Sequence, residues 1–459
     1  MKKTVLLILA VLTAAILSSG CFAEELSSGD YLYSILADGT AEILSYRGTE
    51  ADISVPEAFE EIKVTSIGKQ AFAYNTALQT VSIPEGVTAL GDHAFGECTA
   101  LTAASLPEGL VWMGDGVFQG CVLLEKINLP GSLIRIGWNP FDRCDVLDGL
   151  ELPEENPFYS VQDGVLFDTK ANMLVSYPGG LKDTAYTVPE WVGSIGMAAF
   201  SENSFLQEIT LPDGMTELSG NPFCGCVSLS RVIISGQNPV FEVSDGALFN
   251  KQTRELTAYL WGTEVTAYRV PAGTASIAQE ALYKHPELNF VSLPESVRSI
   301  GTAAFAESGL VSIRIPEGVA YLGDSTFSGC RNLMTVSLPK NLASIGNSVF
   351  YECVHLVRID LPSSLRSIGS AAFYLCQSLT SVRIPEGVSS IGNYAFAGCL
   401  NLTAVSLPKS LVSIGNGVFY ADDKIFLTVP EGSFAEEWAK ENGINTEQKP
   451  LTPVQTEMI

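Results

Sequence analysis

The sequence contains little of the chemistry on which most enzymes depend. It has only three histidines in 459 residues, and His93, His285 and His355 have no partner at the spacing of a catalytic pair or a metal site. Its ten cysteines include no Cys-x-x-Cys pair, which argues against zinc. The sequence therefore predicts no catalytic residue, no metal and no cofactor.

Basic residues are also scarce. The chain has 26 Lys and Arg against 51 Asp and Glu, a net charge of −25. Phosphate binding needs a basic surface, so a nucleic-acid partner is excluded. Charged residues make up only 17% of the chain and hydrophobic residues 46%, which argues against intrinsic disorder.

The sequence contains only one long hydrophobic run, near its start. Lys2 and Lys3 precede the apolar run 5–17, which is too short to span a membrane comfortably and is typical of an export signal over residues 1–23. Signal peptidase could cut before Glu24, or Cys21 could be acylated, because Ser19-Gly20-Cys21 is similar to a bacterial lipobox. Either cleavage predicts an exported protein at the cell surface or outside the cell, with membrane contact only through a lipid on Cys21.

The chain is instead rich in an internal repeat. An Ile-Gly pair or a near variant begins at thirteen positions, and every step between them is 22 or 23 residues except two of 59. The positions are Ile67, Leu90, Met113, Ile136, Ile195, Leu218, Ile277, Ile300, Leu322, Ile345, Ile368, Ile391 and Ile414. This period is the length expected of a leucine-rich solenoid.

Each regular unit divides into two parts. The first is a short strand closed by proline, in which alternation places Val81 and Ile83 inside and Thr80 and Ser82 outside. The second follows the Ile-Gly pair, where a residue such as Asn393 predicts the N-cap of a short helical turn. The turn carries a phenylalanine that we expect to stack in a buried column. These are Phe72, Phe95, Phe118, Phe141, Phe200, Phe223, Phe305, Phe327, Phe350, Phe373, Phe396 and Phe419.

Eight cysteines share one slot, three residues after the repeat phenylalanine. They are Cys98, Cys121, Cys144, Cys226, Cys330, Cys353, Cys376 and Cys399. The other five units place Asn75, Asn203, His285, Ser308 and Asp422 there, all of which form hydrogen bonds. We therefore expect the slot to face backbone groups, with reduced thiols as weak donors rather than a disulfide ladder.

The repeat sets the predicted domain boundaries. Residues 24–46, with a hairpin signal at Asp38-Gly39, form an N-terminal cap; residues 47–430 form the solenoid; residues 431–459 form a capping helix and tail. Insertions near 153–189 and 238–271 account for the two long steps and match each other at an offset of 82. They are either hairpins that project from the solenoid wall and shape a binding face, or a longer repeat with no separate role.

Written as x-V-x-[LI]-P-x-x-[VL]-x-x-I-G-x-x-A-F-x-x-C-x-x-L, the unit resembles the BspA-like class of bacterial leucine-rich repeats over residues 47–430. The resemblance implies a curved right-handed solenoid with a parallel sheet on its concave side, found on secreted or surface proteins, some of them adhesins. Together with the helical turns, this predicts an α/β repeat solenoid with two hairpin-type insertions.

The outward side of the sheet is mainly small and polar, with exceptions in the second half. These exceptions are the candidate partner-binding residues Arg231, Ile233, Phe290, Arg314, Arg358 and Arg383. Two functions remain open. The protein is a non-catalytic binding module that docks an unknown protein or glycan, on a host matrix or another cell, on its concave face. Alternatively it is a passive envelope or coat spacer, with arginines neutralised as in an Asp360–Arg383 pair.

Overall fold

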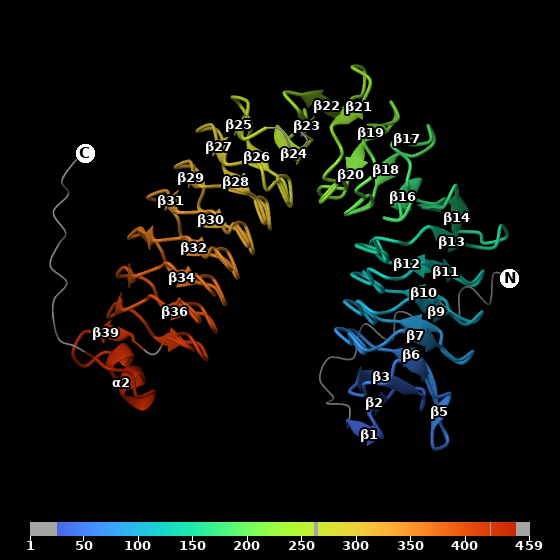
Figure 1. Cartoon of the computed structure of the whole chain (residues 1–459), viewed down its shortest axis with the longest axis horizontal. Coiled ribbons are helices and arrows are strands. Elements are labelled where there is room, and N and C mark those ends of the chain that lie inside the picture. Colours follow the sequence, from blue (N-terminus) through green and yellow to red (C-terminus); the bar gives the residue numbers. More distant parts are fainter. Residues whose placement is uncertain (1–24, 261–264, 423, 447–459) are drawn as a thin grey trace. The chain divides into compact units, whose positions relative to one another are not determined.

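The computed structural model describes residues 25–260, 265–422 and 424–446, so the predicted export signal and Cys21 lie outside the described residues. The chain divides into two compact units, residues 1–160 and 161–459. Each unit is a β-solenoid, in which every repeat forms one rung and successive rungs pair through parallel strands (Figure 1). The predicted solenoid is confirmed.

One row of strands is formed by the segments that precede the repeat proline, and we call them the proline strands. In the first unit they are β4 (Asp52–Ser54), β7 (Thr80–Ser82), β9 (Ala103–Ser105), β11 (Lys126–Asn128) and β13 (Gly149–Glu151). In the second unit they are β17 (Ala185–Thr187), β19 (Glu208–Thr210), β21 (Arg231–Ile233), β25 (Ala267–Arg269), β27 (Phe290–Ser292), β29 (Ser312–Arg314), β31 (Thr335–Ser337), β33 (Arg358–Ile359), β35 (Ser381–Arg383), β37 (Ala404–Ser406) and β39 (Phe426–Thr428). Val81 and Ile83 are buried and Ser82 is exposed, as alternation predicts.

A second row, which the sequence did not reveal, is formed at the Ile-Gly pairs, and we call its members the isoleucine strands. In the first unit they are β6 (Ile62–Ile67), β8 (Ala89–Leu90), β10 (Trp112–Met113) and β12 (Arg135–Ile136). In the second unit they are β16 (Met173–Ser176), β18 (Ser194–Ile195), β20 (Glu217–Leu218), β24 (Glu255–Tyr259), β26 (Ser276–Ile277), β28 (Ser299–Ile300), β30 (Tyr321–Leu322), β32 (Ser344–Ile345), β34 (Ser367–Ile368), β36 (Ser390–Ile391) and β38 (Ser413–Ile414). Apart from β6, β16 and β24, each has only two residues, so that only pairing across rungs identifies it as a strand.

The segment after each glycine is a column of turns, so the prediction of helical turns is wrong. Ala371 and Tyr394 adopt left-handed φ angles of 52° and 55°, which a helix does not allow. The backbone N–H of Phe373 bonds the carbonyl of Ala395 in the next rung at 2.7 Å, rather than a carbonyl four residues back. Hydrogen bonding between rungs therefore replaces the helix.

The polar residue after the glycine caps the next rung instead of a helix. Oδ1 of Asn347 accepts the N–H of Ser370 at 2.8 Å, and Oδ1 of Asn393 accepts the N–H of Asn416 at 2.8 Å. Glycine is required at this position because neighbouring rungs approach closely there. A Cβ at Gly369 would collide with the backbone of Gly346.

The phenylalanine column is confirmed. All twelve rings are buried, and neighbours from Phe305–Phe327 to Phe396–Phe419 stack with centroids 5.0–5.9 Å apart. Each of the eight slot cysteines donates its thiol to the carbonyl of the phenylalanine 25 or 26 residues earlier, at 2.9–3.2 Å. The nine described cysteines are all buried.

Both ends of the described chain close the stack. Strands β1 (Leu26–Ser28), β2 (Tyr31–Ile35) and β3 (Ala41–Tyr46) form an antiparallel meander on β6, and β5 (Ala58–Phe59) pairs with β6 from the side. Helix α2 (Phe434–Glu441) begins where Ser433 accepts the N–H of Glu436. Trp438 packs edge-on against Phe419, centroids 6.2 Å apart, whereas Phe434 is exposed rather than sealing the last rung with it.

Each insertion contributes a modified rung to the stack. In the second unit β15 (Val165–Asp168) pairs antiparallel with β16, and β22 (Phe241–Ser244) and β23 (Ala247–Asn250) pair antiparallel in series with β24. The strand β14 (Tyr159–Gln162) lies at the boundary of the two units. Because β16 and β24 continue the isoleucine row, the inserted strands extend that row instead of projecting from it. Tyr177 stacks on Phe200 at 5.2 Å and takes the place of a repeat phenylalanine.

Candidate binding surface

The six predicted binding residues all lie on proline strands of the second unit. Phe290, Arg314 and Arg358 are on β27, β29 and β33 of one five-stranded sheet, and Arg383 is on β35, in the next repeat after β33. Arg231 and Ile233 are on β21 in a three-stranded sheet, and β35 belongs to another three-stranded sheet, so only Phe290, Arg314 and Arg358 share one sheet. We call the outward side of the proline strands from β21 to β35 the proline-strand face.

Three of the four arginines are paired with carboxylates. Arg231 contacts Glu208 at 2.8 Å, and Arg314 contacts Glu295. The second pair raises the pKa of Arg314 and lowers that of Glu295, chiefly through the hydrogen bond between them. Exposed pairs of this kind contribute only about 0–1 kcal/mol, so they do not prevent these arginines from meeting a partner.

The Asp360–Arg383 pair that the sequence suggests is not formed. Asp360, just after β33, accepts from Nε and Nη2 of Arg358, two residues earlier in the chain, at 3.0 and 2.9 Å. Within the part of the chain that the structure describes, no carboxylate forms an ion pair with Arg383. Arg383 therefore presents an exposed and uncompensated charge on this face.

Sequence reasoning missed apolar residues beside these arginines. Met334 and Val357 directly precede β31 and β33, and their side chains are 48% and 46% exposed, close to the 52% of Phe290. Arg269 on β25 is also exposed. Alternation within the three-residue strands could not reveal Met334 and Val357, because both lie just outside the strands. Later repeats have Thr380 and Thr403 at the position of Met334 and Val357. The change from threonine to an apolar residue is the sequence signal that could have revealed these two residues.

Burial keeps two titratable side chains, Cys98 and His285, uncharged near pH 7. Burial raises the pKa of the Cys98 thiol to about 12 and lowers the pKa of His285 to about 4, so both are neutral near pH 7. In residues 25–446, leaving aside 261–264 and 423, no three His, Cys, Asp or Glu side chains are grouped to hold a metal ion. The same residues include no helix long and apolar enough to cross a membrane.

The fold and this face together define a leucine-rich repeat protein whose prominent exposed feature is a mixed cationic and apolar strand surface. The model of the BspA type leucine rich repeat region matches residues 56–174, 180–258, 256–369 and 343–431. The chain belongs to this family, which confirms the resemblance seen in the repeat unit.

Solved structures similar to this chain are bacterial leucine-rich repeat proteins. One from Bacteroides ovatus is 22% identical, with a TM-score of 0.37, and the match covers 92% of this chain and 99% of that one. A leucine-rich cell surface protein from Faecalibacterium prausnitzii is 22% identical, with a TM-score of 0.35 and coverage of 94% and 100%. The pneumococcal vaccine antigen PcpA is 18% identical, with a TM-score of 0.42 and coverage of 94% and 99%. No curated protein matches the chain.

Proposed function

We propose that this chain is exported and acts as a non-catalytic surface protein that binds a protein or glycan through its proline-strand face. Repeat solenoids present extended surfaces of this kind and commonly serve binding alone. The family membership supports a binding scaffold, and the N-terminal sequence supports export.

The exposed Arg383, together with the exposed Phe290, Met334 and Val357 in the preceding rungs, is the observation that carries this proposal. Protein interfaces are enriched in arginine, methionine and aromatic residues relative to the rest of the surface. Here these residue types project from rungs β27–β35, while the neighbouring outward positions Ser337 and Ser381 are small.

Charge determines the kind of partner. The chain carries a net charge of −25, so an acidic partner is repelled by most of its surface and attracted locally by the arginines. Rungs lie about 4.8 Å apart, which separates Arg314 and Arg383 by roughly 14 Å. We infer a partner with acidic groups at a comparable separation.

A passive spacer is the alternative. The carboxylates that neutralise Arg231, Arg314 and Arg358 favour it, because such pairs are what a solvated face with no partner would form. A partner captured through the proline-strand face would exclude this alternative.

Capture of a partner by the mature chain from matrix and cell-surface extracts tests the proposal. The variant with Arg231, Phe290, Arg314 and Arg383 all changed to Ser should lose capture and keep its melting temperature, since outward positions contribute little to the core. A matched control changes Lys126 on β11 and Arg135 on β12 of the first unit to Ser and should capture normally. Wild-type capture by the quadruple variant would contradict the proposed face.

The mass of the exported protein tests the proposed export. It should correspond to a chain acylated at Cys21 or to one that begins at Glu24. A mature chain that begins elsewhere would contradict both cleavage schemes.

A further inference from the structure

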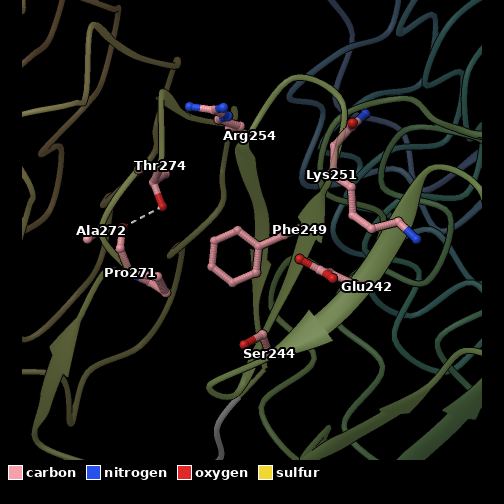
Figure 2. Close-up of a pocket in the computed structure, with 10 residues that line it drawn as sticks. Glu242, Ser244, Phe249, Lys251, Arg254, Pro271, Ala272 and Thr274 are labelled. Atoms are coloured by element: carbon pink, nitrogen blue, oxygen red, sulfur yellow. Dashed lines mark hydrogen bonds between the residues drawn. The ribbon is translucent and has the colours of Figure 1, made fainter. Parts of the chain in front are cut away.

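In the second insertion a cavity of about 320 Å³, open to solvent, lies between the β22–β23 hairpin and the loop 271–274 that follows β25 (Figure 2). The ring of Phe249, on β23, faces this space, with Pro271, Ala272 and Thr274 across from it. The volume is at the lower end of the range for small-ligand pockets, which is about 300–1,000 Å³.

The first insertion shows what fills the equivalent space. At the offset of 82, Phe249 corresponds to Phe167 and Gly273 corresponds to Trp191. The indole of Trp191 packs on Phe167 with ring centroids 5.1 Å apart and leaves Phe167 fully buried. The second insertion has Gly273 in place of this indole, and Phe249 remains 7% exposed where Phe167 is fully buried.

Glycine keeps the second space open. Gly273 has a φ of +93°, a conformation that side-chain-bearing residues rarely adopt, and no heavy atom lies within 4 Å of the position that a Cβ would occupy. Trp191 is not in this left-handed region. The loop 271–274 therefore has its own backbone conformation, and the chain provides no side chain at this position to cover Phe249.

The rim of the cavity carries charges that the first insertion lacks. Arg254 stands where the first insertion has Asn172, and Glu242 where it has Ser160. In the described residues no ion pair involves either side chain. Lys251 is turned away, because its amine donates to the carbonyl of Asn238 (Figure 2).

We propose that this cavity binds an aromatic ring that carries a nearby carboxylate, with the ring over Phe249 and the carboxylate at Arg254. Glu242 is the acceptor for a ring N–H, so an indole is preferred to a phenyl ring. The ligand is either a free aromatic acid or a tryptophan beside an acidic residue in a peptide. The proposal does not rest on the proline-strand face, which lies on other residues.

Isothermal titration of the whole mature chain with N-acetyltryptophan, its uncharged amide and the peptide acetyl-Gly-Trp-Glu-Gly-amide tests this site. N-acetyltryptophan should bind more tightly than N-acetylphenylalanine. Arg254→Gln should weaken its binding about tenfold or more and leave the amide unchanged, since only the carboxylate needs the guanidinium. Tighter binding of the peptide would identify a partner segment as the source, and tighter binding of N-acetyltryptophan would identify a small molecule.

Two further variants keep the test decisive. Ala272→Trp places an indole in the cavity from a residue outside the left-handed region and should abolish binding of all three probes. Arg269→Gln, an exposed arginine on β25 that does not line the cavity, should bind as the wild type does. The proposal is overturned if the wild-type chain binds no probe at millimolar concentration, or if the Ala272→Trp chain binds them unchanged.

Discussion

At the scale of single residues, the cysteine slot shows how different side chains satisfy the same backbone. The thiol of Cys353 donates to the carbonyl of Phe327 at 3.2 Å. In another rung Asn203 donates to the carbonyl of Leu181 at 3.1 Å and accepts the N–H of Leu206 at 2.9 Å. A buried carbonyl without a donor costs about 1–3 kcal/mol, which explains why the residue types found in this slot are ones that can form hydrogen bonds.

The thiols should be reduced and unreactive in the folded protein. Burial raises the pKa of Cys98 to about 12, so iodoacetamide at pH 8 should label none of the nine described thiols until the chain is unfolded. Unfolding in urea without reductant should then expose all nine to labelling, as mass spectrometry can count. Labels missing in pairs, and recovered after reduction, would show disulfides instead.

The same shift makes stability depend on pH on the alkaline side. An unfolded thiol ionises near its ordinary pKa of 9.0, while the folded thiol stays protonated towards pH 12. The stabilisation is therefore complete below pH 9 and is lost as the pH rises above it, by up to about 1.4 kcal/mol per unit for each thiol.

His285 should make the second unit sensitive to acid. Its folded pKa is lowered from 6.5 to about 4 by burial, so its contribution is complete above pH 6.5 and is lost as the pH falls towards 4. His285→Asn, which introduces the residue found at Asn75 and Asn203, should flatten urea stability between those pH values. The control is His355→Asn, at an exposed position. An unchanged slope in the His285→Asn variant would contradict this role.

At the scale of elements, the ladder after each glycine can be tested by two matched asparagines. Asn393→Ala removes the acceptor of the Asn416 N–H and should lower the free energy of unfolding by about 0.5–1.5 kcal/mol. Asn416→Ala makes the same change in the last rung. The side chain of Asn416 has no following repeat to cap, so this substitution should lower the free energy of unfolding much less. Equal losses in urea titrations would show that the ladder is not the source of the effect.

The sequence predicted the elements that depend on periodicity and missed those that depend on neighbouring rungs. Alternation identified the buried Val81 and the exposed Ser82, and the repeat phenylalanines identified the core column. The isoleucine strands and the turns at Ala371 and Tyr394 depend on hydrogen bonds between residues 22 or 23 apart, which local capping rules do not describe. The insertions were ambiguous for the same reason.

The candidate site was predictable only in part. The sequence located the arginines on the right strands, because side-chain alternation places Arg314 and Arg383 outward. It could not predict that Asp360 would pair with Arg358, two residues earlier, since the choice between two nearby arginines depends on side-chain conformation. The opening over Phe249 likewise became visible only when the two insertions could be compared in space.

At the scale of the whole molecule, we propose that the second unit is the binding unit. Its proline-strand face carries Arg383 with Phe290, Met334 and Val357, whereas the corresponding positions of the first unit are mainly small or polar, such as Ser82 and Ser105. An acidic solenoid with a cationic and apolar face is suited to a partner that contacts several rungs at once.

Hydroxyl-radical footprinting of the captured complex tests this claim most directly. Met334 and Phe290 are about half exposed in the chain alone and oxidise readily when accessible. The account predicts that a bound partner strongly reduces their oxidation and leaves that of Tyr74 and Leu123, exposed in the first unit, unchanged. Undiminished oxidation of Met334 and Phe290 in the complex would contradict it.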